Sequence, residues 1–507
     1  MEHESKYPDN RWLILGVMSL SLIIVMLNNV TLNVALPELS KDLKAGNSEL
    51  QWIMDSYALV FGGTLLLMGA LGDRFGRKGA LQIGLIIVAS ASAWTALYAE
   101  TSNQVIFARA AMGLGAALVM PSTLSVVLVV FPPEERGKAI GIWAAMAGIG
   151  APIGLLVGGW AVENYDWQMV FLINVPVIII ALVAGALIIP RSKDSTGKPL
   201  DLVGSALSVV ALGSLLYGII EGPSLGWDDQ NVILAFVAFL LSGAMFVRSQ
   251  LRSEHPLLPL EFFYQRQFTI GLMAIALAMF VMFSFMFMQM LHFQLVRGLS
   301  PLEAAIRFFP LPLGLMPAAA NSDRLVGKLG RKKVVTLGLS LVAAGLLLFT
   351  LVTTETAYVQ IALTFVLLGL GMGLTMAPST TAIMEAIPES KAGVGSATND
   401  ASREVGGALG IAIGGSVLNQ IYQKSLVIPE SFSHIKDVLS SSFPAAMRVG
   451  AETGGPEGAA LIASAQEAFV SGMVGSCYVA AGVAAIAAII VWTKLPDEAA
   501  TNSTSEE

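Results

Sequence analysis

The sequence is poor in charge, because only 13% of its 507 residues are Asp, Glu, Lys or Arg. Soluble domains average about 25% charged residues, so this composition excludes an ordinary soluble domain. The single cysteine, Cys477, excludes an intrachain disulfide, and the four scattered histidines indicate no metal site. The sequence also has no Gly-Lys-Ser/Thr phosphate-binding loop, which argues against ATP as the energy source.

Long apolar runs take the place of charge: 55% of the residues are hydrophobic and the mean hydropathy is +0.71. A run of about 18 residues or more is long enough to cross roughly 30 Å of hydrocarbon. The first run, from Trp12, is long enough to remain as an anchor rather than serve as a cleaved signal. The breaks between runs predict fourteen spans, near 12–35, 50–70, 79–98, 103–128, 138–161, 168–189, 202–221, 231–248, 268–291, 302–321, 334–352, 357–379, 395–420 and 467–492.

The basic residues predict the orientation of these spans. An even number of spans places both termini on one side, and most of the 29 Lys and Arg lie in the termini and the loops on that side. Examples are the clusters at 74–78 and 331–333. The positive-inside rule therefore predicts cytoplasmic termini, an external loop at 421–466, and a multi-pass protein of the cell (inner) membrane.

The two halves of the chain resemble each other. Three landmarks recur in one register: residues 113–123 at 369–380, 76–78 at 330–332, and 133–134 at 388–389. Chance similarity between Gly- and Leu-rich spans is the alternative, but the matching proline and basic positions lie outside that biased composition. We predict an all-α polytopic membrane fold in which two six-helix bundles form a parallel repeat, with two inserted helices. The predicted boundaries are 1–190 for the first bundle, 191–266 for the insert and linker, 267–494 for the second bundle, and 495–507 for a cytoplasmic tail.

Two motifs point to a family. The loop after the second span reads Gly69-Ala-Leu-Gly-Asp-Arg-Phe-Gly-Arg-Lys, where glycines allow helix ends to approach and Asp73 can accept from a helix terminus or from Arg77. The fourth span carries Arg109-x-x-x-Gly-x-Gly. Together these motifs resemble the major facilitator superfamily. The fourteen spans resemble its drug:H+ antiporter-2 group, and the QacA-type multidrug exporters most closely. Further matches along the chain are at 32–39, 51–57, 171–176, 255–260, 298–301 and 406–410.

The resemblance implies a proton-coupled secondary antiporter, not an enzyme, that exports amphipathic small molecules such as lipophilic cationic drugs and so confers antibiotic resistance. It implies protons, substrate and the lipid bilayer as partners, a functional monomer, and no cofactor, metal or nucleic acid. The sequence departs from the family at two points. Asn28 stands where the family has an aspartate in its first span. In the antiporter motif of the fifth span, the proline is Pro152 rather than the residue at Leu155.

Charged residues inside predicted spans are costly to bury, so each is a candidate for function. We assign proton coupling to Asp55, Arg109, Asp400 and Glu404; the substrate cavity to Asn28, Trp52, Tyr57 and Arg403; and the conformational gate to Gly69, Asp73, Arg74, Arg77, Pro152, Gly158 and Gly159. Other readings remain open. Asp55 could reach outer water, Arg109 could bridge helices structurally, and Arg403 could neutralise Asp400 on the same helix face.

Two other functions also fit these residues. The embedded carboxylates and arginines balance, with Arg307 as the third arginine. The balance leaves room for an exporter of neutral or anionic amphiphiles, such as lipids or siderophores. The departures at Asn28 and Leu155 leave room for a sensor or scaffold that transports nothing.

Overall fold

The computed structural model describes residues 8–192, 201–254, 256, 258, 260–387 and 392–496, and these residues form helices and connecting turns without a β-strand. The first half contains α1 (Arg11–Asp42), α2 (Asn47–Phe75), α3 (Arg77–Tyr98), α4 (Ser102–Val130), α5 (Pro133–Asn164), α6 (Met169–Leu172) and α7 (Asn174–Ile188). The insert contains α8 (Leu202–Leu225), α9 (Gln230–Arg252) and η1 (Leu260–Tyr264). The second half contains α10 (Arg266–Leu291), η2 (His292–Val296), α11 (Pro301–Ile306), α12 (Pro310–Leu329), α13 (Arg331–Phe349), α14 (Tyr358–Glu385), α15 (Ala392–Ser425), η4 (Glu430–Ile435), α16 (Lys436–Ser441), α17 (Phe443–Thr453) and α18 (Gly455–Lys494).

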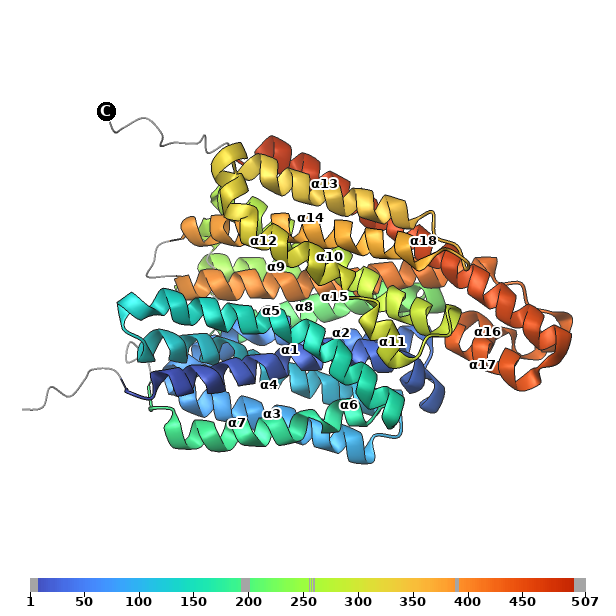
Figure 1. Cartoon of the computed structure of the whole chain (residues 1–507), viewed down its shortest axis with the longest axis horizontal. Coiled ribbons are helices and arrows are strands. Elements are labelled where there is room, and N and C mark those ends of the chain that lie inside the picture. Colours follow the sequence, from blue (N-terminus) through green and yellow to red (C-terminus); the bar gives the residue numbers. More distant parts are fainter. Residues whose placement is uncertain are drawn as a thin grey trace, which may run out of the picture.

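The long helices run side by side along the long axis of the molecule (Figure 1). α1 begins and α18 ends at the same end, which we call the termini end. At the opposite end α16, α17 and the first turns of α18 project beyond the other helices, and we call this the hairpin end (Figure 1). At 1.5 Å per residue, the 40 residues of α18 reach about 60 Å, well beyond the hydrocarbon thickness.

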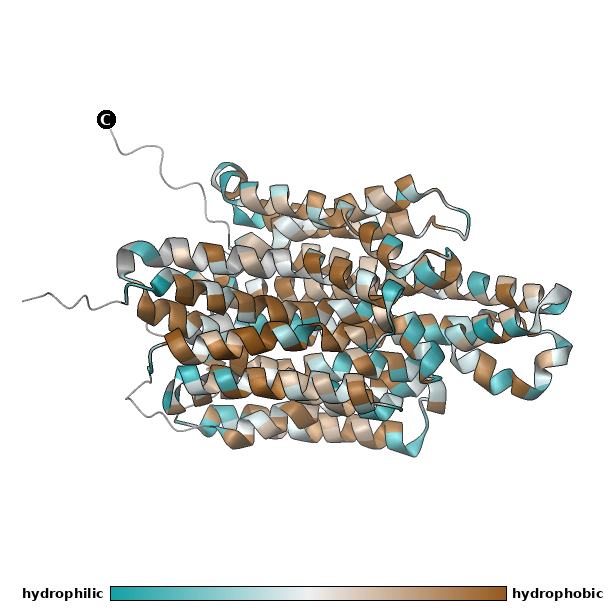
Figure 2. Ribbon diagram, turned by 60° about the horizontal axis from the view of Figure 1, so that its bottom comes forward, coloured by the Kyte–Doolittle hydropathy of each residue, from teal (hydrophilic) through white to brown (hydrophobic). Residues whose placement is uncertain are grey.

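The helices have the composition of membrane spans. Among the described residues, eleven helices are long and apolar enough to cross a bilayer. Their middles are hydrophobic, and hydrophilic residues gather at both ends of the molecule (Figure 2). The 18-residue apolar window of α9 is only 11% buried, so this helix presents an apolar surface to its surroundings. The chain is therefore a multi-pass membrane protein. The count of fourteen spans stays a prediction, because α2, α5 and α12 are not among the eleven.

The same helix pairs pack most extensively in both halves. α2 packs on α4, α3 on α4, and α1 on α5, while α12 packs on α14, α13 on α14, and α10 on α15. The repeated glycine motif explains part of this match. A Cβ on Gly115 would lie 2.7 Å from the main-chain oxygen of Gly84, and a Cβ on Gly371 would lie 2.5 Å from that of Gly338. Each glycine thus allows the backbones of two helices to touch.

Three predicted elements differ in detail. The predicted span 302–321 is two helices, α11 and α12, separated by the turn at 307–309. The ninth span continues through a π-helical turn, η2, to Val296. The loop predicted at 421–466 is shorter, because α15 continues to Ser425 and α18 already begins at Gly455, and much of the segment between them is helical.

Candidate functional site

The candidate site lies along the contact between α2 of the first half and α15 of the second half, which we call the α2–α15 seam. Three contacts fix an antiparallel register. Asn47 Nδ2 donates to Asn419 Oδ1 at 2.9 Å. Gly415 faces the side chain of Gln51, and a Cβ on Gly62 would lie 2.9 Å from the Cβ of Glu404. Because all three contacts fit one antiparallel register, this register also gives which residue of α15 lies at the same height as each residue of α2 between them.

Asp55 is fully buried on this seam. It lies between Gln51 and Gly62, on the face of α2 that meets α15, and its exposed fraction is 0%. Neither carboxyl oxygen has a hydrogen-bond partner among the described residues. The alternative in which Asp55 reaches outer water therefore does not describe this conformation.

Glu404 and Asp400 lie further along α15. Glu404 is 9% exposed, and its Oε2 has no hydrogen-bond partner in the described part of the chain. Seven residues of α2 separate Asp55 from Gly62, which faces Glu404, so the two carboxyls lie about two turns, or ~10 Å, apart along the seam. Asp400 is half-buried and accepts from Asn399 Nδ2 at 3.4 Å. It interacts electrostatically with Arg403.

Arg109, on α4, contacts a different face of α2 from the face that carries Asp55. Its guanidinium is 0% exposed and donates to the main-chain oxygens of Ile53 at 3.2 Å and Asn28 at 2.9 Å. It also lies 4.3 Å from the ring centroid of Tyr57. These bonds join α4 to α1 and α2, so the helix-bridging role is present. Its Nη2, which carries two N–H groups, has no partner among the described residues and can donate to an incoming acceptor.

Asn28 and Tyr57 complete the surroundings of Arg109. The Asn28 side chain donates to Ile24 O at 3.0 Å and accepts from Asn174 Nδ2 at 3.5 Å. The Tyr57 hydroxyl donates to Val25 O at 3.4 Å. Through its main-chain oxygen and its side chain, Asn28 thus joins α1 to α4 and α7 without a charge.

The inserted helix α8 covers the α2–α15 seam, which the sequence did not indicate. Ser208 Oγ donates to Gly63 O of α2 at 3.1 Å, and Ser416 Oγ of α15 donates to Ile219 O at 2.6 Å. Trp52, predicted for the substrate cavity, turns toward α8, where its Nε1 donates to Glu221 Oε1 at 2.9 Å. Sequence reasoning missed Glu221 because it ends the apolar run 202–221, although it is an acidic residue at the edge of a predicted span.

The gate residues of the loop between α2 and α3 lie at the termini end. Gly69 packs on Pro121 of α4, where an added Cβ would lie 3.3 Å from the proline Cβ. Arg74 is exposed and lies 5.4 Å from the centroid of the Phe75 ring. The backbone N–H of Arg77 donates to Ser192 O at 3.0 Å. Asp73 is in the last turn of α2, and the contacts predicted for its side chain lie outside what the structure describes.

Of the three gate residues in α5, Gly159 meets the other half of the molecule. Pro152 lies within α5, and Gly158 packs on the backbone of Thr31 in α1, 3.0–3.2 Å from an added Cβ. A Cβ on Gly159 would lie 2.9 Å from Leu302 Cα in α11. One turn further, Glu163 Oε2 accepts from Ser300 Oγ at 2.9 Å and from the backbone N–H of Leu302 at 3.1 Å. We call the contact of Glu163 with the start of α11 the α5–α11 clamp.

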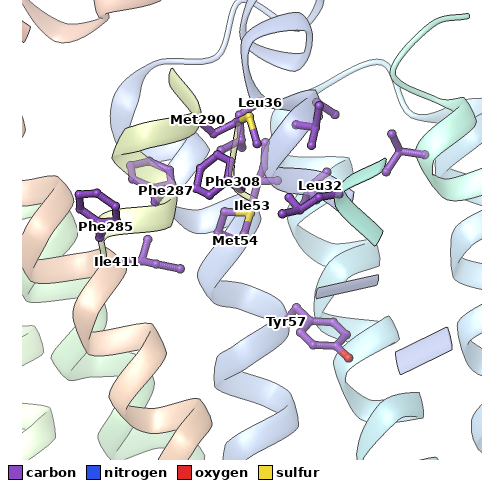
Figure 3. Packing of buried hydrophobic residues seen from close by; sticks show 14 of the residues in the cluster. Leu32, Leu36, Ile53, Met54, Tyr57, Phe285, Phe287, Met290, Phe308 and Ile411 are labelled. Carbon is purple, nitrogen blue, oxygen red and sulfur yellow. The ribbon is translucent and has the colours of Figure 1, made fainter. Parts of the chain in front are cut away.

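Contacts between the halves gather at the hairpin end. Within the described part of the chain, hydrogen bonds between the halves join Asn47 to Asn419, Gln294 to Val34, Glu163 to α11, Ser442 to Ala45 and Arg448 to Lys41. Apolar side chains from both halves fill the space beside them: Leu36, Ile53, Met54, Phe287, Met290 and Phe308 (Figure 3). The hairpin end is therefore closed in this conformation.

Comparisons with known proteins agree on the family. The profile of the Major Facilitator Superfamily matches residues 18–411. The chain is 31% identical to "Multidrug efflux pump LfrA" of Mycolicibacterium smegmatis, over 96% of this chain and 97% of that protein. It is 32% identical to "Methyl viologen resistance protein SmvA" of Salmonella typhimurium, over 91% and 93%. An inward-facing, occupied bacterial homologue of the human lysosomal transporter Spinster has the same fold, with a TM-score of 0.68, 16% identity, and coverage of 96% of this chain and 98% of that one.

Proposed function

Because the chain belongs to the Major Facilitator Superfamily, we propose that it is a proton-coupled antiporter that exports amphipathic drugs across the cell membrane. Relatives that match more than nine tenths of the chain are named for multidrug efflux and for methyl viologen resistance. The names refer to different compounds, which favours an exporter of broad specificity. In this proposal both termini and the termini end face the cytoplasm, and the hairpin end faces outward.

The observation that carries the proposal is the buried carboxyl group of Asp55. A charge inside a membrane protein costs about 3 kcal/mol or more, and Asp55 has no donor among the described residues to offset that cost. Protonation removes the charge, so the sealed seam favours the neutral acid. When the seam opens, water solvates the carboxylate and lowers the free-energy cost of its charge. The protonation state of Asp55 therefore favours one conformation over the other, which is what coupling requires.

Glu404 provides the second protonatable group. It lies about two turns from Asp55 along the seam, and it interacts electrostatically with Arg109 and Asp400. In the present conformation the halves meet at the hairpin end, which supports a state open toward the cytoplasm. In that state a substrate enters from the cytoplasm or the inner leaflet, and Glu404 releases its proton there. Rocking of the halves then carries the substrate outward.

We further propose that the substrates are lipophilic cations. Glu221 adds a fourth embedded carboxyl to Asp55, Asp400 and Glu404, so acids outnumber the embedded arginines Arg109, Arg307 and Arg403. A surplus of acid stabilises a bound cation better than a neutral or anionic molecule. The sequence alone suggested equal numbers of embedded carboxylates and arginines, and Glu221 raises the number of carboxylates by one.

The test is transport by the purified protein in liposomes with an imposed pH gradient. A lipophilic cationic dye reports substrate movement, and an internal pH indicator reports proton movement. We expect dye-dependent proton flux in the wild type and at least a tenfold loss in Asp55→Asn. Glu100→Gln is the matched control, because Glu100 is an exposed carboxyl at the same end of the molecule.

Two results would contradict the proposal. Wild-type protein that moves no protons with any cationic, neutral or anionic amphiphile is not an antiporter, and a sensor or scaffold is then the better description. Asp55→Asn protein that retains full coupled flux shows that this carboxyl is not the coupling group. Unchanged thermal unfolding of the variant in detergent separates loss of coupling from loss of fold.

A further inference from the structure

The inserted helix α8 brings a carboxyl group to the outer end of the α2–α15 seam. Glu221 lies four residues before the end of α8 and is half-buried. Its Oε1 accepts from the indole N–H of Trp52 at 2.9 Å. The two side chains belong to different helices, so the bond fixes the position of Glu221 relative to α2.

The register of α8 on α2 places Glu221 beside the first turn of α2, about one and a half to two turns, or ~8–12 Å along the axis, from Asp55. Ser48 Oγ contacts Ile220 O at 3.5 Å near the hairpin end, and Ser208 Oγ contacts Gly63 O at 3.1 Å deeper in the seam. The two helices are thus antiparallel, with Glu221 beside the first turns of α2. Trp52, the partner of Glu221, precedes Asp55 by three residues, which is about one turn, or ~4.5 Å, along the axis.

The carboxyl groups of Asp55 and Glu221 differ in burial and in hydrogen bonding. Asp55 is fully buried and both of its oxygens are unpartnered in the described structure, whereas Glu221 is half-buried and has one donor. Asp55 therefore needs a group that can bring protons to it from the hairpin end. Within the described structure, Glu49 and Glu221 both lie between Asp55 and that end. Glu49 already accepts from the backbone N–H of Gly46, whereas Glu221 lies on the helix that covers the seam.

We propose that Glu221 is the outer proton carrier of the coupling pathway and passes its proton to Asp55. The inference rests on the proposed antiport function. In the step, the O–H bond of protonated Glu221 breaks and its electron pair stays on Glu221. The proton passes along water that enters the seam when it opens, and it forms an O–H bond on the Asp55 carboxylate. External water then protonates Glu221 again.

The charged groups around Glu221 fit this role. From α2, Glu49 faces it and interacts with it electrostatically; Glu49 is itself held by the backbone N–H of Gly46 at 2.7 Å. From α15, the described neighbours at this level are Ser416 and Asn419, which carry no charge. The negative charge of Glu49 favours proton uptake by Glu221. The Trp52 N–H stabilises the carboxylate that remains after the proton has left.

The test separates proton delivery from substrate binding. Glu221→Gln keeps an acceptor for Trp52 but cannot carry a proton, and Glu221→Asp keeps the acid. In liposomes loaded with a lipophilic cationic dye, two rates are measured: dye transport driven by a pH gradient, and dye-for-dye exchange without a gradient. We expect Glu221→Gln to lose at least tenfold in the first rate while exchange changes less than twofold. Glu221→Asp recovers part of the loss.

The outcomes distinguish this inference from the proposed function. Wild-type protein without proton-coupled transport overturns the function itself. If the wild type couples protons, Asp55→Asn does not, and Glu221→Gln behaves as wild type at every external pH, the carrier role is wrong. Equal loss of both rates in Glu221→Gln also overturns it, because Glu221 then binds substrate or supports the fold. Trp52→Phe, which keeps an aromatic ring but removes the indole N–H, should slow gradient-driven transport more than exchange.

Discussion

The α5–α11 clamp should stabilise the closed hairpin end through the carboxylate of Glu163, and the size of this effect can be estimated from its hydrogen bonds. Glu163→Ala removes the acceptor of two hydrogen bonds, one from Ser300 and one from the backbone of Leu302. Glu163 is exposed, and exposed charged contacts contribute about 0.2–1 kcal/mol because solvent screens them. Loss of both bonds should cost the closed state about 1 kcal/mol. That energy corresponds to a roughly fivefold increase in the ratio of open to closed molecules at this end.

Distance measurements between spin labels test this prediction. Cysteines replace Tyr165 of the first half and Val359 of the second, whose side chains are 53% and 68% exposed, in a Cys477→Ala background. Pulsed EPR then gives the fraction of molecules with the longer distance. Glu163→Gln keeps one acceptor and should give an intermediate shift, and Glu100→Ala should give none. Equal open fractions in Glu163→Ala and Glu100→Ala would refute the clamp.

Two further predictions concern residues packed between helices. Arg109→Ala leaves the carbonyls of Asn28 and Ile53 without their buried donor and should lower the free energy of unfolding by roughly 2–3 kcal/mol, measured by denaturation in detergent; a change below 0.5 kcal/mol would contradict the bridging role. Gly159→Leu places a side chain against the backbone of Leu302, so the same spin-label pair should report a hairpin end that no longer closes, and dye export should fall at least tenfold. Normal export by this variant would mean that close contact of α5 with α11 is dispensable.

Much of the architecture could be predicted because it follows from local pattern. Apolar runs set the helices, and repeated glycines set where backbones touch, as Gly115 and Gly371 do in matching places. Arg109 is buried, as its position inside an apolar span indicated, whereas the sequence left open whether Asp55 reaches outer water. Position along a helix is readable from residue counts, because the rise per residue is constant.

The neighbours of each helix face could not be predicted in this way. Asp55 and Arg109 are at similar depth, yet Asp55 faces α15 and Arg109 bonds to the opposite side of α2. The partner of Trp52 was missed because it lies 169 residues away, on an inserted helix whose position depends on tertiary packing. The division of the predicted span 302–321, by contrast, has a local signal, because α12 begins at Pro310 and proline favours the first turn of a helix over its interior.

The position of α8 has a consequence for molecules dissolved in the bilayer. A two-bundle transporter has two lateral seams through which a lipid-soluble compound can enter without first passing through the aqueous mouth. α8 lies over one of these seams and forms hydrogen bonds with both α2 and α15, so it blocks entry from the bilayer on that side. Under the proposed function, a compound that enters from the inner leaflet would therefore reach the interior along the opposite side, between α5 and the start of the second bundle.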